Sequence, residues 1–155
     1  MAAVIRPALP ADRAAIERIV NAAYATYIPR IGKPPAPMLD DYAVRIAAGE
    51  VWVLDDGHPI GVVVLIAEPD HLLLDNIAVA PDCQGRGHGR RLLGFADAEA
   101  ARRGHAVLRL YTHALMHENL ALYLAQGWRE YARGSQSGYD RVFMEKRLTA
   151  DPTLR

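Results

Sequence analysis

Two periodicities of apolar residues divide the chain into strands and helices. Short apolar runs bounded by turn residues are typical of strands, whereas apolar residues three and four positions apart are typical of helices. The short runs predict strands at residues 4–6, 51–54, 60–67, 71–79, 106–112, 128–133 and 139–148. The helical spacing predicts helices at residues 10 to about 29, 38–48, about 90–103 and 116–126.

The order of these elements predicts a single α/β domain. Strands come first and then alternate with helices, which is typical of a mixed sheet with helices on both faces. The 155 residues are enough for one such domain, and we assign it to residues 1–148. Residues 149–155 show no apolar periodicity, so we expect them to form a loose C-terminal tail.

A glycine-rich junction joins the strand at 71–79 to the helix that follows. Gly85, Gly87 and Gly89 alternate there, and Leu92 and Leu93 begin the apolar face of the helix. Glycines allow tight turns and close approach of a ligand to the backbone. The first amides of a helix have no intrahelical partner and lie at the positive end of its dipole. The junction therefore predicts a site for phosphate or another anion.

Two common phosphate loops do not fit this junction. A nucleoside-triphosphate loop ends in Gly-Lys-Ser or Gly-Lys-Thr, whereas Gly89 is followed by Arg90 and Arg91. A dinucleotide fingerprint would need glycine instead of Arg90 and an acidic residue about 20 positions further on. The chain has neither, so a different coenzyme is expected.

Two sequence blocks resemble the GCN5-related N-acetyltransferase (GNAT) superfamily. The first block is Gln84-x-x-Gly87-x-Gly89, preceded by Ile77-Ala78-Val79-x-Pro81. The second is Asn119-x-x-x-Tyr123 with Gly127-Trp128, at the matching distance downstream. The Tyr24 to Tyr42 region also looks like one uncharacterised bacterial subgroup of these acetyltransferases.

The resemblance implies a fold and a coenzyme. The expected fold is a mixed central sheet of about seven strands, in which two parallel central strands splay apart. Acetyl-CoA, as co-substrate, would lie in that gap. The implied coenzyme-binding residues are Ile77, Ala78, Val79, Gln84, Gly85, Arg86, Gly87, His88, Gly89, Arg90 and Asn119.

The resemblance also implies direct acetyl transfer to a primary amine of a small molecule or peptide. Tyr123 occupies the position of the acid that protonates the leaving thiolate, although its spacing alone favours a core aromatic. Many relatives carry a glutamate base where this chain has Leu73. Asp75, on the same face of that strand, is our first candidate for the base, and His113 is the second. Asp75 could instead bond a neighbouring backbone group or Arg109.

The acceptor side in this family is covered by the first two helices and the linker between them. Arg30 and Asp40 also lie in this region, and Asp40 and Asp41 have an alternative role as first-turn residues that complement a helix dipole. The candidate substrate-binding residues are Tyr24, Tyr27, Ile28, Met38, Asp41 and Tyr42.

Composition excludes several other functions. The chain has 18 basic and 18 acidic side chains without a basic stripe, so no nucleic-acid partner is expected. It has no apolar run of about 20 residues and no leader segment, so we expect a cytoplasmic protein without a membrane partner. The lone Cys83 is expected to be an inert loop thiol. His113 and His117 lack a third ligand, so no metal is expected.

The sequence leaves two alternative functions and the oligomeric state open. Because Leu73 replaces the glutamate, the chain could be a non-catalytic acyl-CoA sensor. Transfer of a longer acyl chain, or transfer to a hydroxyl oxygen, would use the same motifs. The family implies a homodimer, and the last strand, residues 139–146, would present an edge for pairing.

Overall fold

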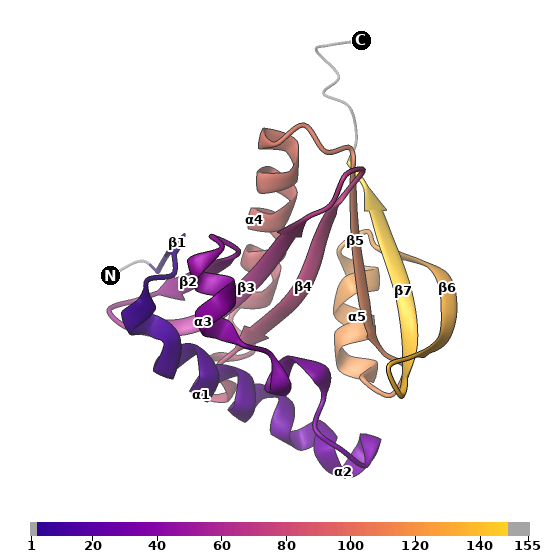
Figure 1. Ribbon diagram of the computed structural model, residues 1–155, viewed down its shortest axis with the longest axis horizontal. Helices are drawn as coiled ribbons and strands as arrows, with labels where there is room; N and C mark the ends of the chain where they lie inside the picture. Colours follow the sequence, from indigo (N-terminus) through magenta and orange to yellow (C-terminus); the bar gives the residue numbers. More distant parts are fainter. Residues whose placement is uncertain (1–2, 149–155) are drawn as a thin grey trace.

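The computed structural model describes residues 3–148 of the chain. The expected tail at residues 149–155 lies outside the described residues. Seven strands form one sheet in the order β1-β2-β3-β4-β5-β7-β6 (Figure 1). Their bounds are β1 Val4–Pro7, β2 Val51–Asp55, β3 Pro59–Ala67, β4 Leu72–Val79, β5 Val107–His113, β6 Arg129–Gln136 and β7 Tyr139–Arg147.

Helices cover both faces of the sheet and enclose two apolar cores. On one face lie α1 (Arg13–Tyr24), α2 (Ile28–Ile31) and α3 (Tyr42–Ala47), while α4 (His88–Arg102) and α5 (His117–Ala125) lie on the other (Figure 1). The buried face of α1 consists of Ile16, Ile19, Val20 and Tyr24. This mixed sheet between two helical layers confirms the predicted α/β class.

The central strands β4 and β5 are parallel and touch only at their beginnings. Leu72 pairs with Leu108 and Leu73 pairs with Arg109, and no further pairs follow within the described residues. The other neighbouring strands are antiparallel and pair over four residues or more. The two strands therefore part toward their C-terminal ends, which confirms the predicted splay.

A bulge interrupts β4 near the point where the strands part. Val64 on β3 pairs with Asn76 and Leu65 pairs with Leu74, so Asp75 is the extra residue. Side chains alternate between the faces of a regular strand, and one extra residue shifts that alternation. Leu72 and Leu74 belong to the core under α4, whereas Ala78 belongs to the core under α1. The bulge thus lets Asp75 and Asn76, although adjacent in sequence, line the same pocket.

The structure differs from the sequence-based expectation in three places. The helix expected from Pro10 is divided: a 3-10 turn precedes α1, and a second 3-10 turn separates α1 from α2. The helix expected over residues 38–48 begins only at Tyr42, because Asp40 has extended backbone and the Asp41 side chain accepts a hydrogen bond from the Val44 amide. The last strand, β7, is not an edge, because it lies between β5 and β6.

Candidate active site

An open cleft lies along the glycine loop, and its volume is about 560 Å³. We call it the glycine-loop cleft. Arg86 is the one predicted coenzyme-binding residue that does not line it. The predicted residues that do line it are Ile77, Ala78, Val79, Gln84, Gly85, Gly87, His88, Gly89, Arg90 and Asn119.

The loop is held in a shape that only glycine adopts easily. Gly85 and Gly87 have φ angles of +79° and +81°, and Gly87 is the N-cap of α4. The Gln84 side chain donates a 3.0 Å hydrogen bond to the Val79 carbonyl and so ties the loop to the end of β4. A Cβ at Gly89 would lie 3.4 Å from Leu122 of α5. The free amides of the first turn of α4 therefore line a fixed anion-binding edge.

The opposite wall of the cleft comes from the N-terminal helices. Arg30 forms an ion pair with Glu118 of α5 at 2.9 Å, and the Tyr27 hydroxyl donates a 3.2 Å hydrogen bond to the same carboxylate. The hydrogen bond from Arg30 lowers the pKa of Glu118 to about 2, and burial raises the pKa of Tyr27 to about 12. Thr26, Glu118 and Leu122 also line the cleft but were not predicted. Thr26 and Glu118 lie outside the two motif blocks, and Leu122 is an unspecified position of the second block.

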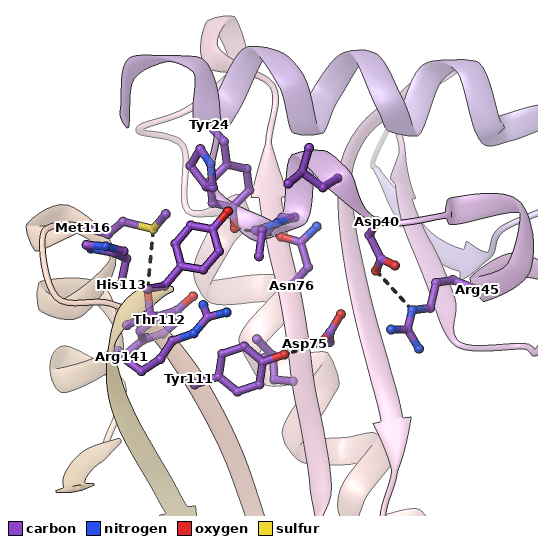
Figure 2. Close-up of a pocket in the computed structure, with 17 residues that line it drawn as sticks. Tyr24, Asp40, Arg45, Asp75, Asn76, Tyr111, Thr112, His113, Met116 and Arg141 are labelled. Atoms are coloured by element: carbon purple, nitrogen blue, oxygen red, sulfur yellow. Dashed lines mark hydrogen bonds and ion pairs between the residues drawn. The ribbon is translucent and has the colours of Figure 1, made fainter. Parts of the chain in front are cut away.

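A second cavity of about 300 Å³, the inner pocket, opens where β4 and β5 have separated. Figure 2 shows Asp75 and Asn76 reaching in from β4, and Tyr111, Thr112 and His113 from β5. Tyr123 of α5 and Arg141 of β7 also line it, as do residues 35–37, 39 and 40 of the segment before α3. Tyr24 lines both cavities, so they adjoin at its side chain.

Asp75 is a partly buried carboxylate in the inner pocket. The Tyr111 hydroxyl donates a hydrogen bond to it at 3.2 Å. Burial raises the pKa of Asp75, against the opposing charge of Arg45. Arg109, the alternative partner considered from the sequence, lies beside Glu145 instead, at 3.6 Å. Asp75 thus faces the pocket without an ion-pair partner within residues 3–148 and binds protons more readily than an ordinary aspartate.

His113 is buried in the same pocket but has a more restricted role. Burial lowers the pKa of its imidazole, so the ring is neutral at pH 7. Its Nδ1 accepts a 3.1 Å hydrogen bond from the Leu115 amide, which places the proton of the neutral ring on Nε2. The single lone pair of the ring is therefore occupied, and Asp75 is the better placed proton acceptor.

Tyr123 combines core packing with access to the inner pocket. Its ring packs against Trp128 with centroids 6.2 Å apart, and only 4% of the residue is exposed. Burial raises the pKa of its hydroxyl, which stays protonated at neutral pH. That hydroxyl has no hydrogen-bond partner within residues 3–148, so its proton is available to a ligand. Both roles considered for Tyr123 from the sequence are compatible in one side chain.

A chain of hydrogen bonds fixes the wall between the two cavities. The Tyr24 hydroxyl lies 2.7 Å from Asn76 Oδ1 and 2.9 Å from the Ile77 carbonyl oxygen, and it can donate to either. The Asn76 amide donates to the Tyr42 hydroxyl, which donates to the Pro37 carbonyl. Asn76 was not predicted, because strict alternation along β4 would have placed it on the face opposite Asp75.

The predicted acceptor residues fall in different places. Tyr24 lines both cavities and Tyr27 lines the glycine-loop cleft. Tyr42 lines neither cavity, but its hydroxyl accepts a hydrogen bond from the Asn76 amide. Ile28, Met38 and Asp41 line neither cavity, and Asp41 caps α3 through its side chain. Asp40 lines the inner pocket and is paired with Arg45 at 3.1 Å.

Three further observations concern the Cys83 thiol, metal binding and membrane spans. Burial raises the pKa of Cys83, and the nearby Asp82 carboxylate adds to the effect, so this thiol is less reactive than an ordinary cysteine. No group of three His, Cys, Asp or Glu side chains within residues 3–148 is arranged to hold a metal ion. The same residues contain no helix that is both long and apolar enough to cross a membrane.

Comparison with known proteins identifies relatives at the level of family and fold. The model of the acetyltransferase (GNAT) domain matches residues 47–130. A GCN5-related N-acetyltransferase from Rhodopseudomonas palustris is 25% identical, with a TM-score of 0.77 over 96% of this chain and 97% of its own. The ribosomal-protein-S18-alanine N-acetyltransferase from Escherichia coli is 26% identical, with a TM-score of 0.74 over 99% of both chains.

A third structure shares the fold at lower identity. The PaiA N-acetyltransferase from Thermoplasma acidophilum, in complex with coenzyme A, is 18% identical, with a TM-score of 0.77 over 96% of this chain and all of its own. Comparison with curated protein sequences finds no match.

Proposed function

Because the chain belongs to the GNAT acetyltransferase family, we propose that it moves an acetyl group from acetyl-CoA to a primary amine of a small molecule or peptide. The transfer is direct, within a complex that holds both substrates. The observation that carries this proposal is the meeting of two cavities at the splay of β4 and β5. The glycine loop lines one cavity, the ionisable side chains of Asp75, His113 and Tyr123 line the other, and Tyr24 lines both.

The glycine-loop cleft fits acetyl-CoA. The free amides at the start of α4 match its pyrophosphate. Beyond Leu73, β4 does not pair with β5, so the backbone groups on that edge of β4 are free to bond a ligand. The complex of the Thermoplasma acidophilum relative with coenzyme A supports this choice. When bound, acetyl-CoA supplies an acetyl thioester, whose sulfur departs in the reaction.

Tyr123 holds the proton that the departing sulfur needs. A thiol has a pKa of about 8.5, and a tyrosine of about 10 or higher keeps its proton at pH 7 and can donate it as the thiolate forms. The hydroxyl of Tyr123 has no other partner within residues 3–148, and its burial keeps it protonated.

Asp75 prepares the acceptor. With a pKa near 10.4, only about one alkylamine molecule in 2,500 is neutral at pH 7. Asp75 attracts the ammonium form and accepts its proton, and the raised pKa of this carboxyl makes it a stronger base than an exposed aspartate. The bulge in β4 places Asp75 in the pocket although Leu73 occupies the position of the glutamate in many relatives.

The first test is thermal melting of the purified protein with and without acetyl-CoA, followed by an acetyl-transfer assay on a panel of amines. A ligand at 100 times its Kd stabilises the folded state by about 2.7 kcal/mol, which raises the Tm measurably. Gly87→Glu should abolish the rise, because it places a carboxylate and a strained φ of +81° at the loop. Gly94→Glu is the matched control, since it lies on the same helix and its side chain would meet open space.

The two measurements separate the competing functions. A rise in Tm for the wild type and Gly94→Glu, together with acetylation of an amine, supports the proposal. A rise in Tm without transfer to any amine or hydroxyl would favour the acyl-CoA sensor suggested by Leu73. No rise at millimolar acetyl-CoA would overturn the assignment of the cleft.

A further inference from the structure

Arg141 is an unusual arginine within the described part of the chain. It is 8% exposed, and no carboxylate lies within 4 Å of its guanidinium among residues 3–148. The other arginines without a carboxylate partner in this part of the chain are Arg18, Arg86, Arg90 and Arg91, and all four are exposed. A buried charge is costly unless it is paired, so this exception needs a physical explanation.

Two aromatic rings hold the guanidinium in place. Its central carbon lies 4.5 Å from the ring centroid of Tyr111 and 4.9 Å from that of Tyr139. Stacking on rings stabilises the cation through the ring faces and does not use its N–H donors. The Nε of Arg141 is buried and has no hydrogen-bond partner within residues 3–148. No group within residues 3–148 accepts a hydrogen bond from this cation.

The inner pocket is the cavity that lies beside this guanidinium. Arg141 lines it, and Figure 2 shows its guanidinium lying over Tyr111, with Asp75 beyond the hydroxyl of that ring. Because Tyr111 stacks on Arg141 and donates a hydrogen bond to Asp75, the two charges stand on either side of one tyrosine. The pocket thus presents a positive group and a negative group at separate points.

None of the charged groups around Arg141 within residues 3–148 forms an ion pair with it. The adjacent Asp140 accepts a hydrogen bond from the Ser135 hydroxyl at 3.3 Å. His113, its partner across β5 and β7, is a ring kept neutral by burial and by the Leu115 amide. Asp40 and Arg45, which also line the pocket, are paired with each other. A planar guanidinium fork matches a carboxylate, which can accept two parallel hydrogen bonds from it.

We infer that the amine acceptor of this protein also carries a carboxylate, and that Arg141 binds that carboxylate while Asp75 receives the amine. The acceptor is then a small amino acid or a close analogue, a class of zwitterion that suits a pocket of about 300 Å³. This inference rests on the proposed acetyl transfer, of which it specifies the substrate class. Arg141 acts as a specificity-determining residue.

The test compares acceptors that differ only in the carboxylate. Initial rates with acetyl-CoA are measured for the common L-amino acids and for their α-carboxamides. We expect kcat/KM of the wild type to favour the preferred amino acid over its amide by at least tenfold. Arg141→Gln should lower kcat/KM for the amino acid by about 10- to 100-fold, the loss typical of a charge-assisted hydrogen bond, and leave the value for the amide unchanged.

Two control variants show whether the loss of activity is specific to the guanidinium of Arg141. Arg141→Lys keeps the charge but loses the fork, so it should fall between the wild type and Arg141→Gln. Arg147→Gln, on the same strand and outside both cavities, should match the wild type. Both Arg141 variants should retain the rise in Tm with acetyl-CoA, which shows that they fold.

A binding measurement without coenzyme separates this inference from the proposed function. The Tm of the wild type and of Arg141→Gln is measured with each amino acid, each amide and inorganic phosphate. Stabilisation by an amino acid that is lost in Arg141→Gln supports the inference even if no acetyl transfer occurs. Equal rates and equal stabilisation by acids and amides, no response to any compound, or stabilisation by phosphate alone would overturn it.

Discussion

The hydroxyl of Tyr123 is the smallest group on which the proposed reaction depends. Phenylalanine retains the ring that packs against Trp128 and removes only the oxygen, which has no partner within residues 3–148. Tyr123→Phe should therefore leave the Tm and the Kd for acetyl-CoA nearly unchanged. We expect kcat to fall by about 10²- to 10⁴-fold, as for loss of a general acid.

The exposed Tyr131 provides the control for this substitution. Tyr131→Phe removes a hydroxyl from β6, away from both cavities, and should leave kcat unaltered. A Tyr123→Phe enzyme with the wild-type kcat would remove Tyr123 from the mechanism and leave it as a core residue.

Asp75 should cost the protein stability at neutral pH. Its pKa is higher in the folded state than in the unfolded state, so folding disfavours the ionised form. The contribution of Asp75 is most favourable below pH 3.8 and is lost as the pH rises through the folded-state pKa. Asp75→Asn should melt at a higher temperature than the wild type at pH 8, and this difference should shrink toward pH 3.5. The same variant should acetylate amines more slowly.

The measurement is a series of melting curves between pH 3.5 and pH 8. Gln136→Asn, on the exposed strand β6, changes no titratable group and is the control, so its difference from the wild type should not vary with pH. A pH-independent difference for Asp75→Asn would mean that the carboxylate is as well stabilised in the fold as in water.

At the level of single elements, the strands follow their apolar runs closely and the helices less so. The predicted strand at residues 60–67 is observed as Pro59–Ala67, because a continuous buried run has few alternatives. The predicted helix at residues 38–48 loses its first four residues, because the Asp41 side chain caps the later start.

Neither the bulge in β4 nor the position of β7 could be read from the sequence. The bulge depends on the pairing of Leu65 with Leu74 and of Val64 with Asn76, which is a tertiary register. For the same reason, the sequence did not predict that Asn76 lines the inner pocket beside Asp75. The position of β7 depends on its pairing with both β5 and β6, and a hairpin of the same sequence could dock through either strand.

On the scale of the whole molecule, one segment bridges the two halves of the sheet. Only two residue pairs join β4 to β5, but residues 24–42 cross the gap on the side of the N-terminal helices. Arg30 binds Glu118 of α5 and Lys33 donates a hydrogen bond to the Gly138 carbonyl at 2.7 Å. The Tyr139 hydroxyl donates to the Pro34 carbonyl, also at 2.7 Å. The bridging segment thus contacts both halves of the sheet and lines the inner pocket with residues 35–37, 39 and 40.

Tyr139→Phe tests this bridge, because it keeps the ring beside Arg141 and removes one hydrogen bond. We expect the free energy of unfolding to fall by about 1 kcal/mol. Since the segment also lines the inner pocket, KM for the amine should rise while the Kd for acetyl-CoA stays the same. Urea unfolding and steady-state kinetics measure the two effects, and an unchanged KM would show that the bridge does not order the acceptor site.

The two cavities are built from different parts of the polypeptide, and this has a consequence for evolution. The glycine-loop cleft presents backbone amides, which survive the replacement of most side chains around them. The inner pocket presents the side chains of Asp75, Tyr111 and Arg141, each of which a single codon change can alter. Under the proposed function, descendants of this chain can therefore exchange one acceptor for another by point mutation while the acetyl donor stays the same.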